Sequence, residues 1–164
     1  MKRFIIAITG ASGACYAKRL FDVLKDRSEL HVVISERGIE LLKLELGLKT
    51  SYFSGDSVIL YKNSKINTCI ASGSFPTDGM VIVPASMGTI GRVASGFSTT
   101  MVEKAADVIL KEKRKLIIVP RETPFSTIHL KNLLALDQAG AHILPASPGF
   151  YSGQKTFEDL IDFV

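Results

Sequence analysis

The sequence has few cysteines, and their small number excludes several classes of protein. Cys15 and Cys69 are the only two cysteines among 164 residues. Two cysteines cannot build the disulfide framework of a small secreted domain, and these two lack the paired CxxC spacing of a zinc site. We therefore expect two reduced thiols and no bound metal.

Long hydrophobic runs are also absent. After the basic start, the first apolar run extends only from Phe4 to Ile8. This length is too short for the core of a signal peptide or for a membrane span. The protein is therefore expected to be cytoplasmic, without contact to a membrane.

Clusters of positive charge are scarce as well. The formal net charge is +4, but the Lys and Arg residues are spread along the chain. The densest basic stretch, LKEKRKL at 110–116, is interrupted by Glu112. Such a pattern is typical of a solvated helix end and does not favour nucleic-acid binding.

What the sequence does contain is a regular alternation of two patterns. With 46% hydrophobic and 22% charged residues, 164 residues suffice for one globular domain over 1–164. Near-continuous apolar runs predict buried parallel strands, at 3–9, 30–35, 79–85, 115–120 and 141–146. Stretches with apolar residues three and four apart predict crossover helices, at 13–26, 36–47, 99–114 and 127–140. These patterns predict an α/β fold: a doubly wound, mainly parallel sheet in a Rossmann-like or flavodoxin-like three-layer sandwich. Segment 48–78 is expected to be an irregular crossover.

In such a sheet, ligands bind beyond the carboxyl ends of the strands, so the residues after each run are informative. They are 9–13, Ser35, 85–89, 121–124 and 147–151. Most of these stretches carry Gly, Ser or Thr, and the turns TGASG and SMGT each precede a helix. Hydroxyls and helix N-terminal N–H groups suit a phosphorylated ligand. The first turn is thus a candidate cradle for an anion or a flavin.

This turn alone leaves other interpretations open. A glycine-rich turn is also an ordinary way to pass from a strand into a helix, and Ser12 could serve only as an N-cap. The dinucleotide fingerprint GxGxxG is absent, although Glu36 follows the second strand where a ribose ligand would lie. Tyr151 and Lys155 have the spacing of a short-chain dehydrogenase pair, but the glycines and proline around them predict a loop.

Longer stretches carry a family resemblance. In chain order they are TGASGA, ISERG, SGSFPTDGMVIVPASMGT, EKAADVILKEKR, RETPFSTIHLKNLLAL and LPASPGFY. Together they resemble the flavin prenyltransferases of the UbiX/Pad type, over nearly the whole chain. The resemblance implies an FMN-binding enzyme that joins the dimethylallyl group of dimethylallyl phosphate to N5 and C6 of reduced FMN. The product would serve as the cofactor of a UbiD-type decarboxylase, and no metal is required.

The resemblance also implies roles for individual residues. Glu45 would be the acid–base carboxylate, Ser12 would relay protons near N5, and Tyr151 would contact the prenyl phosphate. FMN would be bound by Thr9, Gly10, Ala11, Ser12, Ser35, Ser86, Met87, Gly88, Thr89 and Arg121. The substrate would meet Lys104, Lys111, Glu122 and Tyr151.

Each role has a plainer alternative. The position of Glu45 also fits a solvent-facing helix residue. The position of Glu122 also fits a helix N-terminal acid or a salt-bridge partner of Arg121. Tyr151 has the place of a rim aromatic, and Lys111 that of a solvated lysine at a helix end.

The sequence departs from the family pattern at several positions. Ala85 and Gly88 stand where the family usually has Cys and Lys, and Lys104 stands where Arg is common. The family also continues past FEDLIDFV by a further turn or more of helix, with a basic residue that holds the prenyl phosphate. By resemblance we expect a homo-oligomer, a dodecamer of trimers, with contacts from 48–70 or from 95–102.

Two further functions stay open on the sequence alone. One is a flavin-dependent cysteine decarboxylase of the same superfold, although 36–47 lacks the histidine that such enzymes use. The other is a non-catalytic flavin-binding subunit.

Overall fold

A single parallel sheet lies at the centre of the molecule. The computed structural model describes residues 1–151 and 153–164, and within them six strands pair in the order β3-β2-β1-β4-β5-β6. The strands are β1 (Lys2–Ile8), β2 (Ser28–Ile34), β3 (Val58–Lys62), β4 (Gly79–Ala85), β5 (Leu116–Pro120) and β6 (His142–Ile143). All neighbouring strands are parallel. The predicted doubly wound parallel sheet is confirmed.

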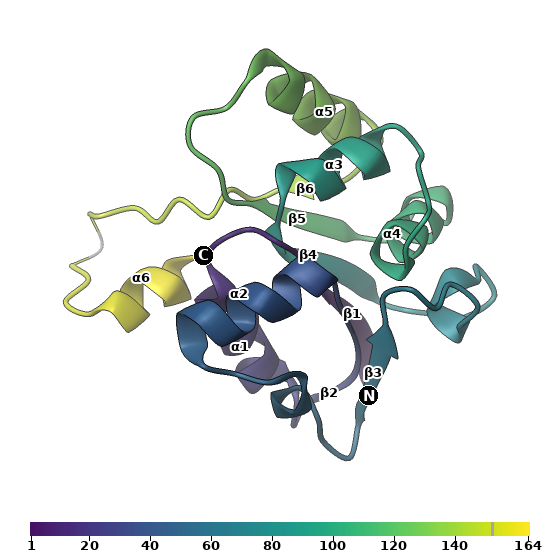
Figure 1. The fold of residues 1–164 in the computed structure, drawn as a ribbon, viewed down its shortest axis with the longest axis horizontal. Coiled ribbons are helices and arrows are strands. Elements are labelled where there is room, and N and C mark those ends of the chain that lie inside the picture. The colour runs from purple at the N-terminus through teal and green to yellow at the C-terminus, as the bar shows by residue number, and fades with distance from the viewer. Residues whose placement is uncertain (152) are drawn as a thin grey trace.

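Helices cover both faces of this sheet, which gives three layers (Figure 1). The helices α1 (Ala14–Leu24) and α2 (Glu36–Leu46) pack on one face. The other face is covered by α3 (Met87–Ala94), α4 (Met101–Lys111) and α5 (Thr127–Gln138). Short 3-10 turns lie at Thr50–Tyr52 and Cys69–Ala71.

The central strand β1 shows why the sheet forms. Its residues Ile5, Ile6, Ala7 and Ile8 are each at most 1% exposed. Side chains alternate between the faces of a strand, so Ile6 and Ile8 pack toward α1 and α2 while Ile5 and Ala7 pack toward α3 and α4. A strand buried on both faces needs an unbroken apolar run, and that is the pattern in its sequence.

The two ends of the sheet differ from the prediction. Strand β3 lies inside 48–78, which was predicted to be irregular, and pairs with β2 from Leu30↔Val58 to Ile34↔Lys62. As an edge strand it leaves Ile59 46% and Leu60 43% exposed, so its sequence need not carry the long apolar run of a central strand. At the other edge, β6 comprises only His142–Ile143 of the predicted 141–146.

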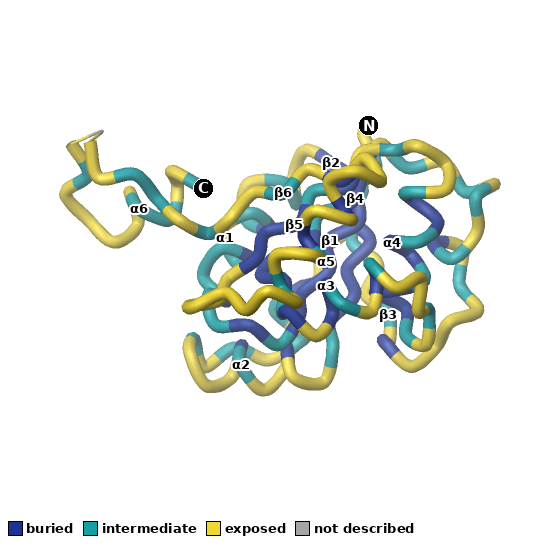
Figure 2. Tube along the Cα trace, turned by 90° about the horizontal axis from the view of Figure 1, so that it is seen from above, coloured by how far each residue is buried: buried dark blue, intermediate teal, exposed yellow. Residues whose placement is uncertain are grey.

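The C-terminal segment extends away from the three layers. After β6 the chain runs out to helix α6 (Phe157–Phe163), and Figure 2 shows this segment at one extremity, largely exposed. Helix α6 turns back against α1, where Arg19 and Asp162 form an ion pair. Within the described residues, no helix is both long and apolar enough to cross a membrane.

Candidate active site

The loops that follow β1 and β4 are tied together at the carboxyl edge of the sheet. The Thr9 hydroxyl donates to the Pro84 carbonyl over 2.7 Å, and the Ser86 N–H donates to the Thr9 hydroxyl over 2.8 Å. Thr9 is 1% exposed, so its side chain joins the two loops rather than facing a ligand. From β1 the strand order runs to β2 on one side and to β4 on the other, which is the switch point where ligands bind in open sheets.

Helix α2 sits directly on the first turn, and two glycines permit this. A side chain on Gly38 would begin 2.7 Å from the Ile8 carbonyl oxygen, and one on Gly10 would begin 2.4 Å from the Cβ of Arg37. Both distances are too short for real Cβ contacts. Gly10 therefore has a packing role that needs no ligand: it lets the first turn of α2 lie against the end of β1.

Ser35 starts α2 beside this turn. Its N–H donates to the Ile8 carbonyl over 2.9 Å, and its hydroxyl accepts the Gly38 N–H over 3.1 Å. It is a conventional N-cap, as Ser commonly is. The hydrogen of its hydroxyl remains available for a ligand.

Glu45, near the end of α2, lies against the first turn. Its carboxylate accepts the Gly13 N–H over 3.0 Å and the Ala14 N–H over 2.8 Å. These N–H groups belong to the start of α1, where Gly13 is the N-cap residue, has φ 111° and offers no side chain. The carboxylate thus occupies the positive end of the helix dipole. Glu45 is solvent-exposed, as the plainer interpretation has it, but its carboxylate is held by two N–H groups.

The surroundings of Glu45 keep it ionised. Burial raises the pKa of its carboxyl, but hydrogen bonds from Ala14, Ser12 and Gly13 lower the pKa further than burial raises it. The positive charge of Arg121 acts in the same direction. The pKa of Glu45 therefore lies below the usual value of a glutamate.

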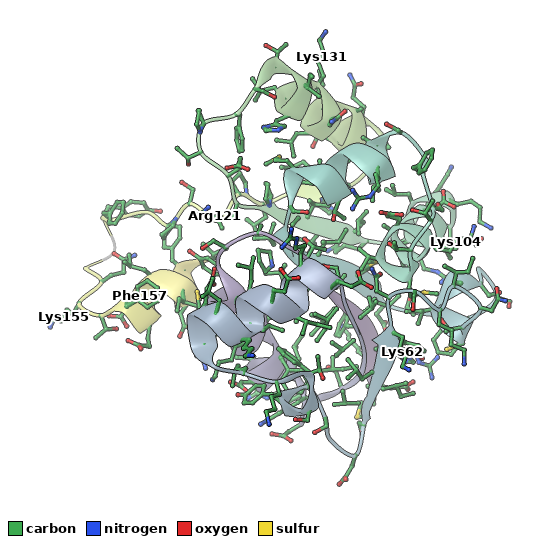
Figure 3. The ribbon with its side chains drawn as sticks, in the orientation of Figure 1. Lys62, Lys104, Arg121, Lys131, Lys155 and Phe157 are labelled. Atoms are coloured by element: carbon green, nitrogen blue, oxygen red, sulfur yellow. The ribbon has the colours of Figure 1, made fainter. Side chains whose placement is uncertain are left out.

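Arg121 brings the third loop to the site. It follows β5 directly, and its Cγ lies 3.9 Å from the place where a Gly13 side chain would begin. Figure 3 shows Arg121 between the α1/α2 layer and the loop that leads to α5. Its neighbour Glu122 accepts the Thr123 N–H over 3.0 Å, and no ion pair joins Glu122 to Arg121 among the described residues.

The loop after β4 is tied to the first turn through Thr9. Ser86 is the N-cap of α3 and accepts the Thr89 N–H over 3.3 Å. Met87 is 9% exposed, and its side chain belongs to the core beneath α3. Gly88 is exposed, whereas Thr89 is buried. This loop therefore offers a hydroxyl and backbone groups to a ligand, but no cation of its own.

Comparisons with known proteins agree with this geometry. The sequence profile of the Flavoprotein family matches residues 1–164. A flavin prenyltransferase UbiX from Methanocaldococcus jannaschii is 43% identical over 162 residues, which are 99% of this chain and 88% of the relative. The chain belongs to the flavin prenyltransferase family. The family membership that the sequence resemblance predicted is confirmed.

Two solved structures of this family have the same fold. A dodecameric FMN-dependent UbiX-like decarboxylase from Escherichia coli O157:H7 is 37% identical with a TM-score of 0.93, over 97% of this chain and 88% of that one. The structure described as AnUbiX (PadA1) in complex with FMN and dimethylallyl pyrophosphate is 39% identical with a TM-score of 0.93. It covers 98% of this chain and 86% of the other.

Two of the residues that the resemblance assigns to substrate binding lie away from Glu45 of the same chain. Lys104 is on α4, in the layer opposite α2, and pairs with Asp107 over 3.5 Å (Figure 3). Lys111 ends α4 just before β5 begins, at the amino edge of the sheet. Tyr151 is 86% exposed, and its ring centroid lies 6.0 Å from that of Phe163. Their roles stay predictions.

Sequence reasoning missed the part played by Gly38 and by the Gly13 and Ala14 N–H groups. A signal for Gly38 was present, because a glycine inside a helix lowers stability and usually marks a close approach. No spacing in the sequence predicts that Glu45 reaches the N–H groups of another helix, 31 and 32 residues away.

Proposed function

We propose that this chain joins the dimethylallyl group of dimethylallyl phosphate to N5 and C6 of reduced FMN. The prenylated FMN would then serve a UbiD-type decarboxylase. The observation that carries the proposal is the ionised Glu45 carboxylate beside Ser12 and Arg121, at the switch point of a flavin prenyltransferase fold. A proton acceptor next to a cation is what transfer of an allyl group from a phosphate requires.

The residues at the carboxyl edge fit a flavin phosphate. The hydroxyls of Ser35 and Ser86 each accept an N–H group, and Ser86 also lies 3.0 Å from the Thr89 hydroxyl. Each can donate its hydrogen to a phosphate oxygen. The guanidinium of Arg121 has no hydrogen-bond partner among the described residues. These groups, with Gly10 to Ser12, would hold FMN. When bound, reduced FMN supplies the two nucleophilic atoms of the reaction.

The chemistry assigned to the chain's own residues is charge stabilisation and proton transfer. Breaking the carbon–oxygen bond of the donor leaves both electrons on the phosphate, and Arg121 stabilises that charge. The bond at N5 would replace the broken carbon–oxygen bond, with the N5 proton leaving on the phosphate. The bond at C6 would consume the double bond of the dimethylallyl group, which takes up one proton while C6 gives up one. Glu45 is ionised and would accept the ring proton and pass it on. The Ser12 hydroxyl helps to lower the pKa of Glu45 and would relay the proton to this carboxylate.

Other functions predict different outcomes in one assay. The protein would be incubated without oxygen with reduced FMN and with dimethylallyl phosphate or pyrophosphate, and the flavin analysed by absorbance and mass. A flavin that carries one dimethylallyl group supports the proposal. Unchanged flavin with tight FMN binding would instead support the non-catalytic subunit. Turnover of a cysteine substrate would support the cysteine decarboxylase, a function for which α2 offers no histidine.

We expect FMN to bind far more tightly than riboflavin, and NAD not to bind. The free serine hydroxyls and the guanidinium of Arg121 are hydrogen-bond donors that the phosphate of FMN can use and that riboflavin leaves unpaired. Flavin fluorescence quenching would give both dissociation constants. Equal constants for FMN and riboflavin would show that these loops are not a phosphate site.

The assembly is proposed to be a closed homo-oligomer, a dodecamer of trimers. Exposed apolar side chains lie in the two segments predicted to make contacts: Ile59, Leu60 and Ile66 in 48–70, and Phe97 in 95–102. Neighbouring subunits would also explain why Lys104 and Lys111 lie far from Glu45 of their own chain. Sedimentation at micromolar concentration is expected to give an oligomer. A monomer that still binds FMN tightly would contradict this.

We propose the cytoplasm as the location of the protein.

A further inference from the structure

A buried carboxylate in α4 holds an arginine of α3 beside the flavin site. Glu103 is 1% exposed and accepts the Thr99 N–H over 2.9 Å, the Thr99 hydroxyl over 2.8 Å and the Thr100 N–H over 3.0 Å. Its other oxygen accepts Nε of Arg92. Burial raises the pKa of Glu103, but the bonds from Arg92 and Thr99 outweigh burial and keep the carboxylate ionised. Arg92 is therefore fixed in place, although its side chain is 47% exposed.

The held guanidinium reaches the loop after β4. Nη2 of Arg92 lies 3.4 Å from the Thr89 hydroxyl oxygen, and that oxygen lies 3.0 Å from the Ser86 hydroxyl. A guanidinium only donates hydrogen bonds. The Thr89 oxygen consequently accepts from Arg92 with one of its lone pairs, and the hydrogen that it keeps can point away from the positive charge, toward Ser86.

With the Thr89 hydrogen in this orientation, the Ser86 hydroxyl has only its own hydrogen left for a further bond. Its oxygen accepts the Thr89 N–H over 3.3 Å and, by the argument above, the Thr89 hydroxyl as well. A hydroxyl oxygen has two lone pairs, so both are used. Ser86 can then only donate, and its remaining hydrogen is free for an acceptor at the N-terminus of α3.

We propose that Arg92 is a positioning residue of the flavin site, which acts through Thr89 to fix the Ser86 hydroxyl as a donor toward an acceptor oxygen of FMN. The inference rests on the proposed function, because it takes FMN as the ligand. The acceptor is an oxygen of the phosphate or a carbonyl of the flavin ring. Gly88 keeps the space beside the guanidinium open, since a side chain there would begin 3.4 Å from Nη1 of Arg92.

A purely structural role for Arg92 gives a different expectation. In that case the pair with Glu103 would only tie α3 to α4, and removing it would lower the melting temperature without changing the affinity of the folded protein for FMN. The double substitution Arg92→Met with Glu103→Gln separates the two roles. It removes the donor without leaving an unpaired buried charge.

The measurement is the FMN dissociation constant of the folded protein, from fluorescence quenching. We expect the double variant to bind FMN about tenfold more weakly, as for the loss of one well-oriented hydrogen bond. If riboflavin binding weakens by the same factor, the acceptor is a ring carbonyl. If only FMN binding weakens, the acceptor is the phosphate. Arg114→Met is the matched control, because Arg114 donates to the carbonyls of Gly73 and Phe75, outside the site. It should leave both constants unchanged.

A double-mutant cycle tests the route through Thr89. In a Thr89→Val background, the changes at Arg92 and Glu103 should have no further effect on FMN binding, because the link to Ser86 is already absent. Equal losses in both backgrounds would overturn the proposal, as would wild-type affinity in the double variant. If the double variant does not fold, Arg92→Lys decides the same question. Lysine keeps the positive charge next to Glu103 but lacks the planar set of N–H donors of the guanidinium. Failure of the wild type to bind FMN would overturn the proposed function and this inference together, whereas retention of affinity by the variants would overturn this inference alone.

Discussion

Replacing Glu45 by Gln is expected to lower the rate of flavin prenylation by about 10²-fold or more, the usual contribution of a general acid–base residue. The amide keeps the size of the side chain, and its oxygen can still accept the N–H groups of Gly13 and Ala14. The start of α1 should therefore keep its shape, and FMN should bind as in the wild type. What is lost is the ability to accept a proton.

The pH dependence gives a second signature of the same residue. A base must be deprotonated to act, and the pKa of Glu45 lies below the usual value of a glutamate. We therefore expect kcat/KM to be constant through neutral pH and to fall only when acid protonates Glu45, below the usual range of a glutamate. This acid limb should be missing from the Glu45→Gln variant.

Single-turnover absorbance of reduced FMN on addition of dimethylallyl phosphate would measure the rate. Glu40→Gln is the matched control, because Glu40 lies on the same helix and pairs with Arg37 at the surface. It should react like the wild type. A Glu45→Gln protein that reacts at the wild-type rate would remove Glu45 from the mechanism.

The fold was predictable because most of its strands are buried on both faces. Strands β1, β2, β4 and β5 need apolar residues on both sides, so each appears as an apolar run. Strand β3 was not recognised, because an edge strand has one neighbour and tolerates exposed residues such as Ile59 and Leu60. The short β6 shows the opposite kind of difference. Its apolar run predicted a strand over 141–146, but only His142–Ile143 pair as a strand.

The site was predictable only in part. Residues after the strands converge at one edge by the topology of any parallel sheet. Ser86 and Arg121 accordingly lie beside the first turn, while their roles stay predictions. The approach of Glu45 to the start of α1 depends on how two helices pack, which local patterns do not encode. The same holds for Arg92, which lies one turn past Thr89 and meets a carboxylate of another helix. The predicted role of Lys111 would need a neighbouring subunit, which a single chain does not show.

Replacing Gly38 by Ala is expected to impair both stability and flavin binding. The new methyl group would begin 2.7 Å from the Ile8 carbonyl oxygen and 3.2 Å from Cγ2 of Ile34. The oxygen belongs to the backbone of a central strand and cannot move aside, so α2 must shift. Overpacking of this kind costs up to about 3 kcal/mol, while Ala gains about 1 kcal/mol of helix propensity over Gly. The free energy of unfolding should thus fall by about 2 kcal/mol.

The functional loss follows because α2 carries both Ser35 at its start and Glu45 near its end. A shift of this helix moves the hydroxyl that we propose binds FMN and the carboxylate that we propose accepts the proton, so FMN affinity and prenylation rate should each fall by on the order of tenfold or more. Urea unfolding and FMN titration would measure the two effects.

Gly47→Ala is the matched control at the other end of α2: Gly47 has φ 65° and nothing within 4 Å of its Cβ position. That change should cost about 1 kcal/mol of backbone strain and leave FMN affinity unchanged. Equal behaviour of the two variants would mean that the close approach of α2 to β1 does not shape the site.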